Sequence, residues 1–396
     1  MPGWQERLRE YSKAKQLVVV GVVQEQHPER ARLYQQWRQL DWPLAIDPLN
    51  QLDYEVVPVP VLIDEHGVVQ RVGRISEEHL KQFVAAETAA LGKVPRELAT
   101  APKELPAQAT FRQTGDWWFL WGAESSPEAG TSLDLAVRNY GSAVDRDAND
   151  ARALFRLGVA LRRRFESPQR QPGDAQRAVD MWQKALTLRP SQYIWRRRIQ
   201  QYGPLLTKPY NFYAWVEEAR REIRQRGETP VSLRVEPFGS EVIGRTASSD
   251  FAPLPLIDPK AQLPTDEAPL VRVEVSITPP RVRPGGRARV RLYLDPGAKS
   301  YWNNEAESLS VSWQPVDGVR ALAPAGKATL PKEAETREPR IREFELVVPS
   351  AAPAGPLVLM GYVSYAVCEA QGGVCRYLRQ DFPMRIVVDP DAQEIR

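Results

Sequence analysis

The sequence predicts a multidomain α+β protein in which an α/β segment, a helical segment and an antiparallel β-sandwich follow one another. Three observations predict this fold class. Short apolar runs first alternate with amphipathic helices, hydrophobic residues then follow the helical period, and after Pro269 they follow a period of two. A chain of 396 residues has room for about two or three such domains.

The bulk composition is that of a globular protein. Hydrophobic residues make up 42% and charged residues 26% of the chain, while 35 prolines indicate linkers or many strand edges. No apolar run reaches the roughly 18 residues of a membrane span, so we expect no transmembrane segment. A net charge of +3 identifies no partner.

Residues 1–95 are expected to form an α/β layer around a central sheet. A charged helix (WQERLREYSKAK) precedes the apolar strand LVVVGVV, and a helix follows at residues 28–40. The stretch VPVPVLIDEHGVVQRVG indicates two strands joined by a turn at Gly67, where glycine adopts a backbone angle that other residues resist.

This segment resembles the redoxin branch of the thioredoxin superfamily. The residues that carry the resemblance are VVVGVV, WPLAIDPLNQLDYEVVPVPVLIDEHGVV and Gly73. The resemblance implies a thioredoxin-like fold and a cis-proline at Pro58, whose alternative is an ordinary trans proline. The family's first strand and cysteine motif are missing. Either the chain starts late relative to the family pattern or the domain has lost its chemistry. We favour a late start, because a sheet without that strand exposes a hydrophobic edge.

Residues 108–225 are expected to form helical repeats. A small-large-small pattern recurs after 42 residues, and removing the eight-residue insertion SPQRQPGD leaves 34, the tetratricopeptide period. The two copies of the pattern are Ala136, Tyr140, Ala143 and Ala178, Trp182, Ala185. The repeats are interpreted as a spacer or as a peptide-binding surface.

Residues 151–200 carry twelve Lys or Arg against three Asp or Glu. This excess favours an acidic protein surface as partner, and a solvated helix face is the alternative. No nucleic-acid-binding motif accompanies the charge, so we expect no nucleic-acid partner.

Residues 226–268 are expected to form a proline-rich linker or a strap along the next domain. Residues 269–390 contain six or more short strands separated by Pro/Gly turns, which predicts an antiparallel β-sandwich. In GRARVRLYLDP one face is apolar and the other is mostly arginine. The apolar face is Ala288, Val290, Leu292 and Leu294, and the opposite face is Arg287, Arg289, Arg291 and Tyr293.

The only two cysteines, Cys368 and Cys375, lie in SYAVCEAQGGVCRYL. Strands on both sides of the glycine-rich turn would place the sulfurs across a hairpin mouth, within disulfide reach. They are interpreted as an exchanging redox pair, a structural disulfide or unpaired thiols. We favour the redox pair, because a domain of this size has little need of a staple and the turn with Gly372 and Gly373 leaves a sulfur accessible.

Residues 270–390 resemble the N-terminal, immunoglobulin-like domain of the thiol:disulfide interchange protein DsbD. The resemblance covers KSYWNNEAESLSVSW, the Gly-Tyr strand before the cysteines and FPMRIVV. It implies that Cys368 and Cys375 exchange electrons with a membrane reductase and thioredoxin-like partners. Tyr362 and Tyr365 are nearby candidates for shielding the pair. The six residues between the cysteines are slightly more than the family pattern has.

The predicted function is thiol:disulfide exchange by an oxidoreductase-like protein. The alternative is a non-catalytic scaffold with a structural disulfide and an inert thioredoxin-like segment. The three histidines, His27, His66 and His79, have no metal-ligand spacing, so we expect neither metal nor cofactor. The expected location is extracytoplasmic, or periplasmic, with no signal sequence in this chain, and cytoplasmic if Met1 is the true start.

Overall fold

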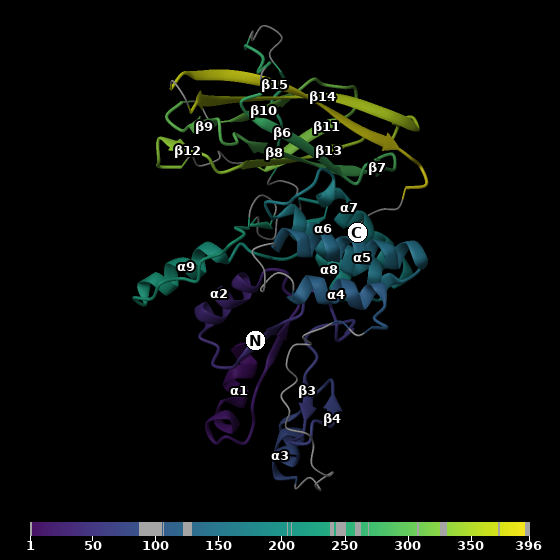
Figure 1. The fold of residues 1–396 in the computed structure, drawn as a ribbon, viewed down its shortest axis with the longest axis vertical. Helices are drawn as coiled ribbons and strands as arrows, with labels where there is room; N and C mark the ends of the chain where they lie inside the picture. Colours follow the sequence, from purple (N-terminus) through teal and green to yellow (C-terminus); the bar gives the residue numbers. More distant parts are fainter. Residues whose placement is uncertain are drawn as a thin grey trace. The chain divides into compact units, whose positions relative to one another are not determined.

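The computed structural model is that of a mixed α+β chain (Figure 1). It describes residues 2–86, 105, 107–121, 129–203, 205–206, 208–237, 241–242, 251–257, 263–267, 269–306, 309–324, 331–370 and 373–392. The chain divides into two compact units. One contains Met1–Arg170, Lys184–Arg197 and Val216–Glu236, and the other Gln171–Gln183, Arg198–Trp215 and Pro237–Arg396. None of the helices in the described residues is long and apolar enough to cross a membrane.

The first unit begins with short helices and strands. They are α1 (Pro2–Lys13), β1 (Gly21–Val23), α2 (Pro28–Arg38), β2 (Leu44–Ile46), β3 (Val61–Ile63), β4 (Val69–Val72) and α3 (Glu77–Ala85). Pro28 suits the first turn of α2, because its missing N–H has no partner there in any case. Ser76 caps the N-terminus of helix α3, because its side chain accepts a hydrogen bond from the backbone N–H of His79. Both helices thus begin where local sequence signals place them.

The central sheet expected for this segment is not formed among the described residues. Strand β1 pairs in parallel with β2, and β3 pairs antiparallel with β4, as two separate two-stranded sheets. Strands of three or four residues offer few backbone hydrogen bonds with which to extend a sheet. The hairpin turn at Gly67 is confirmed, with a φ of 80°.

Helices fill the middle of the chain. They are α4 (Phe111–Trp121), α5 (Ala129–Arg146), α6 (Ala151–Phe165), α7 (Asp174–Leu188), α8 (Tyr193–Tyr202) and α9 (Val216–Gln225). All six residues of the repeated pattern are buried, as that pattern predicts. Helix α4 approaches Tyr140 closely at Gly115, where an added Cβ would lie 2.7 Å from the tyrosine ring. The repeat therefore identified helix-packing positions correctly.

Two mostly antiparallel sheets form most of the second unit. One has the strand order β5-β11-β13-β8-β6, and the other has β12-β9-β14-β15-β7 with β10 beside β14. The strands are β5 (Phe251–Pro253), β6 (Arg272–Thr278), β7 (Arg281–Val282), β8 (Arg287–Asp295), β9 (Ser300–Asn303), β10 (Ser310–Trp313), β11 (Arg320–Pro324), β12 (Glu335–Thr336), β13 (Arg340–Val347), β14 (Gly355–Glu369) and β15 (Cys375–Val388).

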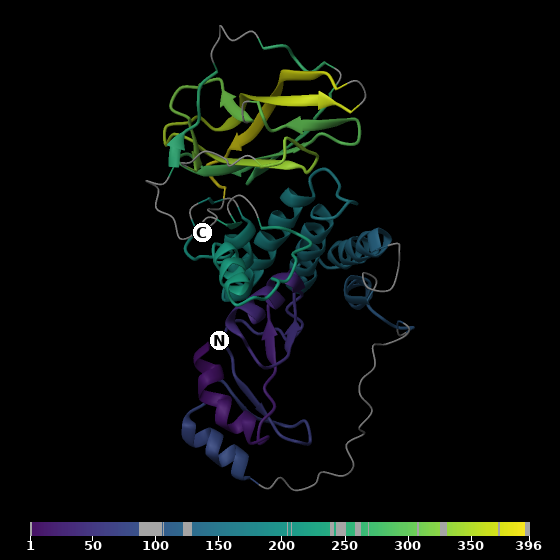
Figure 2. The same ribbon diagram turned by 90° about the vertical axis from the view of Figure 1, so that its left-hand side faces the viewer.

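Both sheets contribute to one hydrophobic core, so they pack face to face. The core includes Leu292 of β8, Phe344 of β13, Val363 of β14 and Met384 of β15. The predicted apolar face of residues 287–295 is fully buried, with Val290, Leu292 and Leu294 in this core and Ala288 in a smaller hydrophobic cluster of the same unit. Figure 2 shows the paired strands β14 and β15, drawn in yellow, from a second side.

Within the predicted linker, residues 251–257 and 263–267 lie along these sheets as a strap. Strand β5 pairs with β11, and Thr265 bridges to Arg379 of β15. The backbone N–H of Asp266 donates to the carbonyl of Arg379 at 2.9 Å, and that of Arg379 donates to the carbonyl of Pro264 at 2.9 Å.

Arg289 and Arg291 on the arginine face of β8 are also buried, because described residues between 198 and 215 cover them. Arg291 pairs with Glu343 of β13 at 2.7 Å, and Arg289 donates to the carbonyl of Tyr202 at 2.5 Å. Arg291 and Glu343 lie directly opposite each other in the strand register, where opposite charges attract. The alternation that predicted two faces was right, and both faces lie inside the second unit.

Candidate functional site

Cys368 and Cys375 form a disulfide between the ends of β14 and β15. They are directly opposite in the register, with their Cα atoms 3.9 Å apart. The backbone N–H of Glu369 donates to the carbonyl of Val374 at 3.0 Å, and Gly373 has a φ of 63°, so glycine suits this turn. Gly372 lies outside the described residues. The predicted hairpin is confirmed, and the interpretation as unpaired thiols is wrong.

The two halves of the disulfide differ in exposure. Cys368 is only 1% exposed, whereas Cys375 is exposed at the start of β15. Cys368 lies in an inner strand, opposite Tyr301 of β9 on one side and Cys375 on the other. Since opposed residues project from the same face of a sheet, the three side chains form one row across three strands. Solvent therefore reaches the bond from the Cys375 side.

Tyr365 does not shield the disulfide. It is three residues from Cys368 and therefore projects from the opposite face of β14. Its side chain is fully buried, its ring lies 5.9 Å from that of Trp302, and its hydroxyl donates to Asp266 at 2.8 Å. Its role is in the core of the second unit.

Tyr362 is also too far away to shield the pair. It shares a face with Cys368, but the six intervening steps of an extended strand separate them by about 20 Å. It lies opposite Asp381 in the register. The prediction for these two tyrosines rests only on their nearness to the cysteines in sequence, and the alternation and length of β14 place both side chains away from the disulfide.

Two other tyrosines flank the disulfide instead. Tyr301 lies opposite Cys368, and Tyr377 follows Cys375 by two residues and so shares its face. The Tyr377 hydroxyl donates to Ser364 at 3.2 Å. The alternation after Cys375 was enough to find Tyr377. Tyr301 depends on the pairing of β9 with β14, which the sequence does not reveal.

A buried polar network ties the strap to both cysteine-bearing strands. Asp266 is 7% exposed and accepts hydrogen bonds from the Tyr365 hydroxyl and, at 3.2 Å, from the Gln380 amide. It also accepts the backbone N–H of Leu270 at 2.9 Å. Burial, followed by the hydrogen bond to Asp266, raises the pKa of Tyr365 well above its ordinary value. These contacts hold β14, β15 and the strap together.

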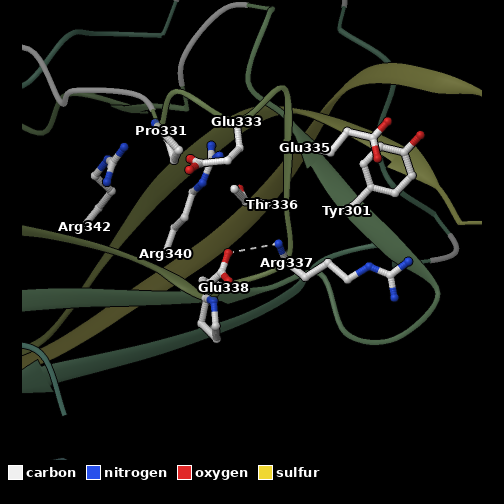
Figure 3. A pocket seen from close by; sticks show the side chains of 10 residues that line it. Tyr301, Pro331, Glu333, Glu335, Thr336, Arg337, Glu338, Arg340 and Arg342 are labelled. Carbon is white, nitrogen blue, oxygen red and sulfur yellow. Dashed lines mark hydrogen bonds between the residues drawn. The ribbon is translucent and has the colours of Figure 1, made fainter. Parts of the chain in front are cut away.

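A hollow of about 830 Å³ adjoins the disulfide row at Tyr301 (Figure 3). We name it the Tyr301 hollow; it is lined by Tyr301 and by side chains between residues 331 and 342. In the view of Figure 3, Tyr301 and Glu335 lie at one end, and Arg340 and Arg342 lie at the other. Burial raises the pKa of Tyr301. The hydrogen bond between the Tyr301 hydroxyl and Glu335 raises this pKa further.

Pro58 in the first unit follows a cis peptide bond, the geometry that the redoxin pattern has at this position. The chain's two cysteines are both in the second unit. The first unit therefore contains no cysteine of its own.

Carboxylates from neighbouring segments neutralise part of the positive charge of residues 151–200. Arg156 pairs with Asp116 at 2.5 Å, and Arg164 pairs with Asp134 at 2.8 Å. Arg189 and Arg152 both pair with Asp53. An acidic partner for this segment stays a prediction. Fewer arginines are available to bind such a partner than the number of Lys and Arg in residues 151–200 suggests.

Within the part of the chain that the structure describes, no three His, Cys, Asp or Glu side chains come together as metal ligands. Comparisons with protein-family models, with curated proteins and with solved structures gave no match.

Proposed function

We propose that this chain exchanges disulfides with a partner protein through Cys368 and Cys375, and that the partner attacks Cys375. The observation that carries the proposal is the asymmetry of the bond, with Cys368 1% exposed and Cys375 exposed at a hairpin end. Thiol–disulfide exchange requires an attacking thiolate to reach one sulfur. A disulfide whose only role is structural does not need a sulfur that a thiolate can reach.

Each step of the exchange balances. A partner thiolate attacks Sγ of Cys375, a mixed disulfide forms, the Cys368–Cys375 bond breaks and Cys368 leaves as a thiolate. A second partner thiolate then attacks the partner's own sulfur and releases Cys375. Two electrons have moved to this chain, and the partner is left with a disulfide. In the reverse direction, reduced Cys375 attacks a partner disulfide and Cys368 resolves the intermediate.

The proposal includes the finer architecture and setting that the resemblances imply. These are a thioredoxin-like first segment, tetratricopeptide-like helices that recruit partners, and a DsbD-like, immunoglobulin-like β domain that carries the chemistry. Such a protein would work outside the cytoplasm, where disulfides persist, with a membrane reductase and thioredoxin-like proteins as its partners. The hairpin disulfide and the packed pair of sheets support the β-domain part.

Single-cysteine variants test the asymmetry. In Cys368→Ser the remaining Cys375 thiol should react with an aromatic disulfide reagent at the rate of an exposed thiol. In Cys375→Ser the buried Cys368 thiol should react at least about 100-fold more slowly, because the reagent must wait for local opening of β14. Equal rates would show that both sulfurs are accessible and would contradict the assigned roles.

The burial of Cys368 favours the alternative function, a scaffold with a structural disulfide. The reduction potential of the disulfide distinguishes this alternative from disulfide exchange. Equilibration of the full chain with glutathione buffers should give a potential near about −200 mV for an exchangeable pair. A value below about −300 mV would identify a structural disulfide.

A further inference from the structure

The far end of the Tyr301 hollow has a local excess of partly buried positive charge. Arg340 and Arg342 are both half-buried, on the β13 side of the hollow. The Arg340 guanidinium lies 4.4 Å from the centre of the Trp302 ring and donates to the side chain of Asn304. Arg342 donates to the carbonyl of Ile341 at 2.9 Å. Among the described residues, no carboxylate forms an ion pair with either guanidinium.

The electrostatics show that these two charges are poorly compensated. Burial, and then the neighbouring charge of Arg342, lowers the pKa of Arg340 to about 10. Burial lowers the pKa of Arg342 as well. An anion bound between the two guanidinium groups would relieve both effects, since it supplies the opposite charge and replaces lost hydration.

The glutamates of the hollow do not supply that charge. Glu333, Glu335 and Glu338 are exposed, so water solvates their carboxylates. Glu335 is hydrogen-bonded to Tyr301, and Glu338 accepts the backbone N–H of Arg337 at 3.2 Å. The dashed line in Figure 3 marks this second contact. In the view of Figure 3 Glu333 lies near Arg340, but among the described residues no glutamate forms an ion pair with Arg340 or Arg342.

We propose that the Tyr301 hollow binds a carboxylate-bearing segment of the partner that exchanges disulfides at Cys375. This inference rests on the proposed function. Tyr301 is separated from Cys375 by two strand spacings, about 10 Å, so a chain attached to the attacking cysteine reaches the hollow within a few residues. An extended peptide running past Tyr301 would place acidic side chains at Arg340 and Arg342.

Two matched peptides test the inference on the oxidised full chain. Each has a single cysteine, followed in one peptide by glutamates and in the other by glutamines. Mass spectrometry follows formation of the mixed disulfide with Cys375. The glutamate peptide should react about fivefold faster, the gain expected of a partly exposed ion pair. The advantage should shrink in high salt, because salt screens exposed charges.

Substitutions of Arg342 assign the effect to the hollow. Arg342→Gln should remove the advantage of the glutamate peptide, and Arg342→Lys, which keeps the charge, should retain part of it. Arg385→Gln is the matched control, an exposed arginine on β15 far along the strand from Cys375, and should leave the advantage unchanged. Circular dichroism checks that each variant is folded.

The outcomes separate the two proposals. If both peptides react with wild type at the same rate, the hollow does not recognise carboxylates, while exchange at Cys375 stands. If neither peptide forms a mixed disulfide, the proposed function fails and this inference fails with it. An advantage that survives in Arg342→Gln would also overturn the inference.

Discussion

Replacing Lys208 by methionine should remove a pH dependence from the stability of the second unit. Lys208 is 2% exposed and lies under the arginine face of β8. Burial, and then the charge of Arg289, lowers its pKa to about 7, although Glu343 and Glu241 act in the opposite direction. In the unfolded chain its pKa is the ordinary value near 10.4. The native state therefore disfavours the charged form of this lysine.

The sign and size of this pH dependence follow from the linkage between proton binding and unfolding. Between the two pKa values the unfolded chain binds the proton and the native state does not, so stability rises with pH. Below about pH 7 both states are protonated and the full penalty is present. At 1.36 kcal/mol per unit, the gain is about 2–3 kcal/mol between about pH 7 and pH 9, and at most about 5 kcal/mol over the whole window. Lys208→Met should abolish this gain.

Guanidinium denaturation of the oxidised chain, followed by circular dichroism across this pH window, measures the effect. The slope is the diagnostic quantity, because Lys208 also donates to the carbonyl of Gln200 at 2.8 Å. Losing that hydrogen bond shifts stability at every pH by about 1–3 kcal/mol without producing a slope. Lys299→Met, at an exposed position of the same unit, is the control. A slope that is equally steep in Lys208→Met would refute the reasoning.

Two further substitutions test the packing that supports the disulfide strands. Gly361→Ala should destabilise the second unit by about 1–3 kcal/mol in thermal denaturation, because the added Cβ would lie 2.3 Å from the ring of buried Phe382. Gly141→Ala, with nothing within 4 Å, should be neutral or stabilising, and similar losses in both would contradict this. Asp266→Asn should cost about 1–3 kcal/mol and lower the pKa of Tyr365 in an ultraviolet titration, since it removes the neighbouring negative charge. An unchanged tyrosine titration would count against that contact.

Local patterns predicted the disulfide hairpin well. Cys368 and Cys375 are close in sequence, and the two strands and the glycine turn are each encoded next to them. The sequence does not predict the row of side chains that includes Tyr301, because strand register is set by tertiary packing rather than by the sequence of either strand alone. The choice of Tyr362 and Tyr365 for shielding failed for a simpler reason, since alternation along one strand excludes Tyr365 from the face of Cys368.

Tertiary packing also explains why the arginine face of β8 could be predicted only in part. Its alternation predicted that Arg289 and Arg291 face away from the sheet core, and they do. Periodicity shows only that the two faces differ, so it does not reveal that described residues between 198 and 215 cover Arg289 and Arg291. In the first unit, apolar runs predicted strands such as β1, but the pairing of β1 with β2 alone left the expected sheet divided.

The position of each cysteine within the sheet gives the two sulfurs different freedom to move. Cys368 lies in an inner strand, paired with β9 and β15, and the network of Asp266, Tyr365 and Gln380 lies on the other face of the same strands. Cys375 is the first residue of β15 and directly follows the turn. When the bond opens, the turn end adjusts at lower cost than an inner strand, because fewer backbone hydrogen bonds have to break. A mixed disulfide on Cys375 can therefore turn toward a partner while Cys368 stays in place to resolve it.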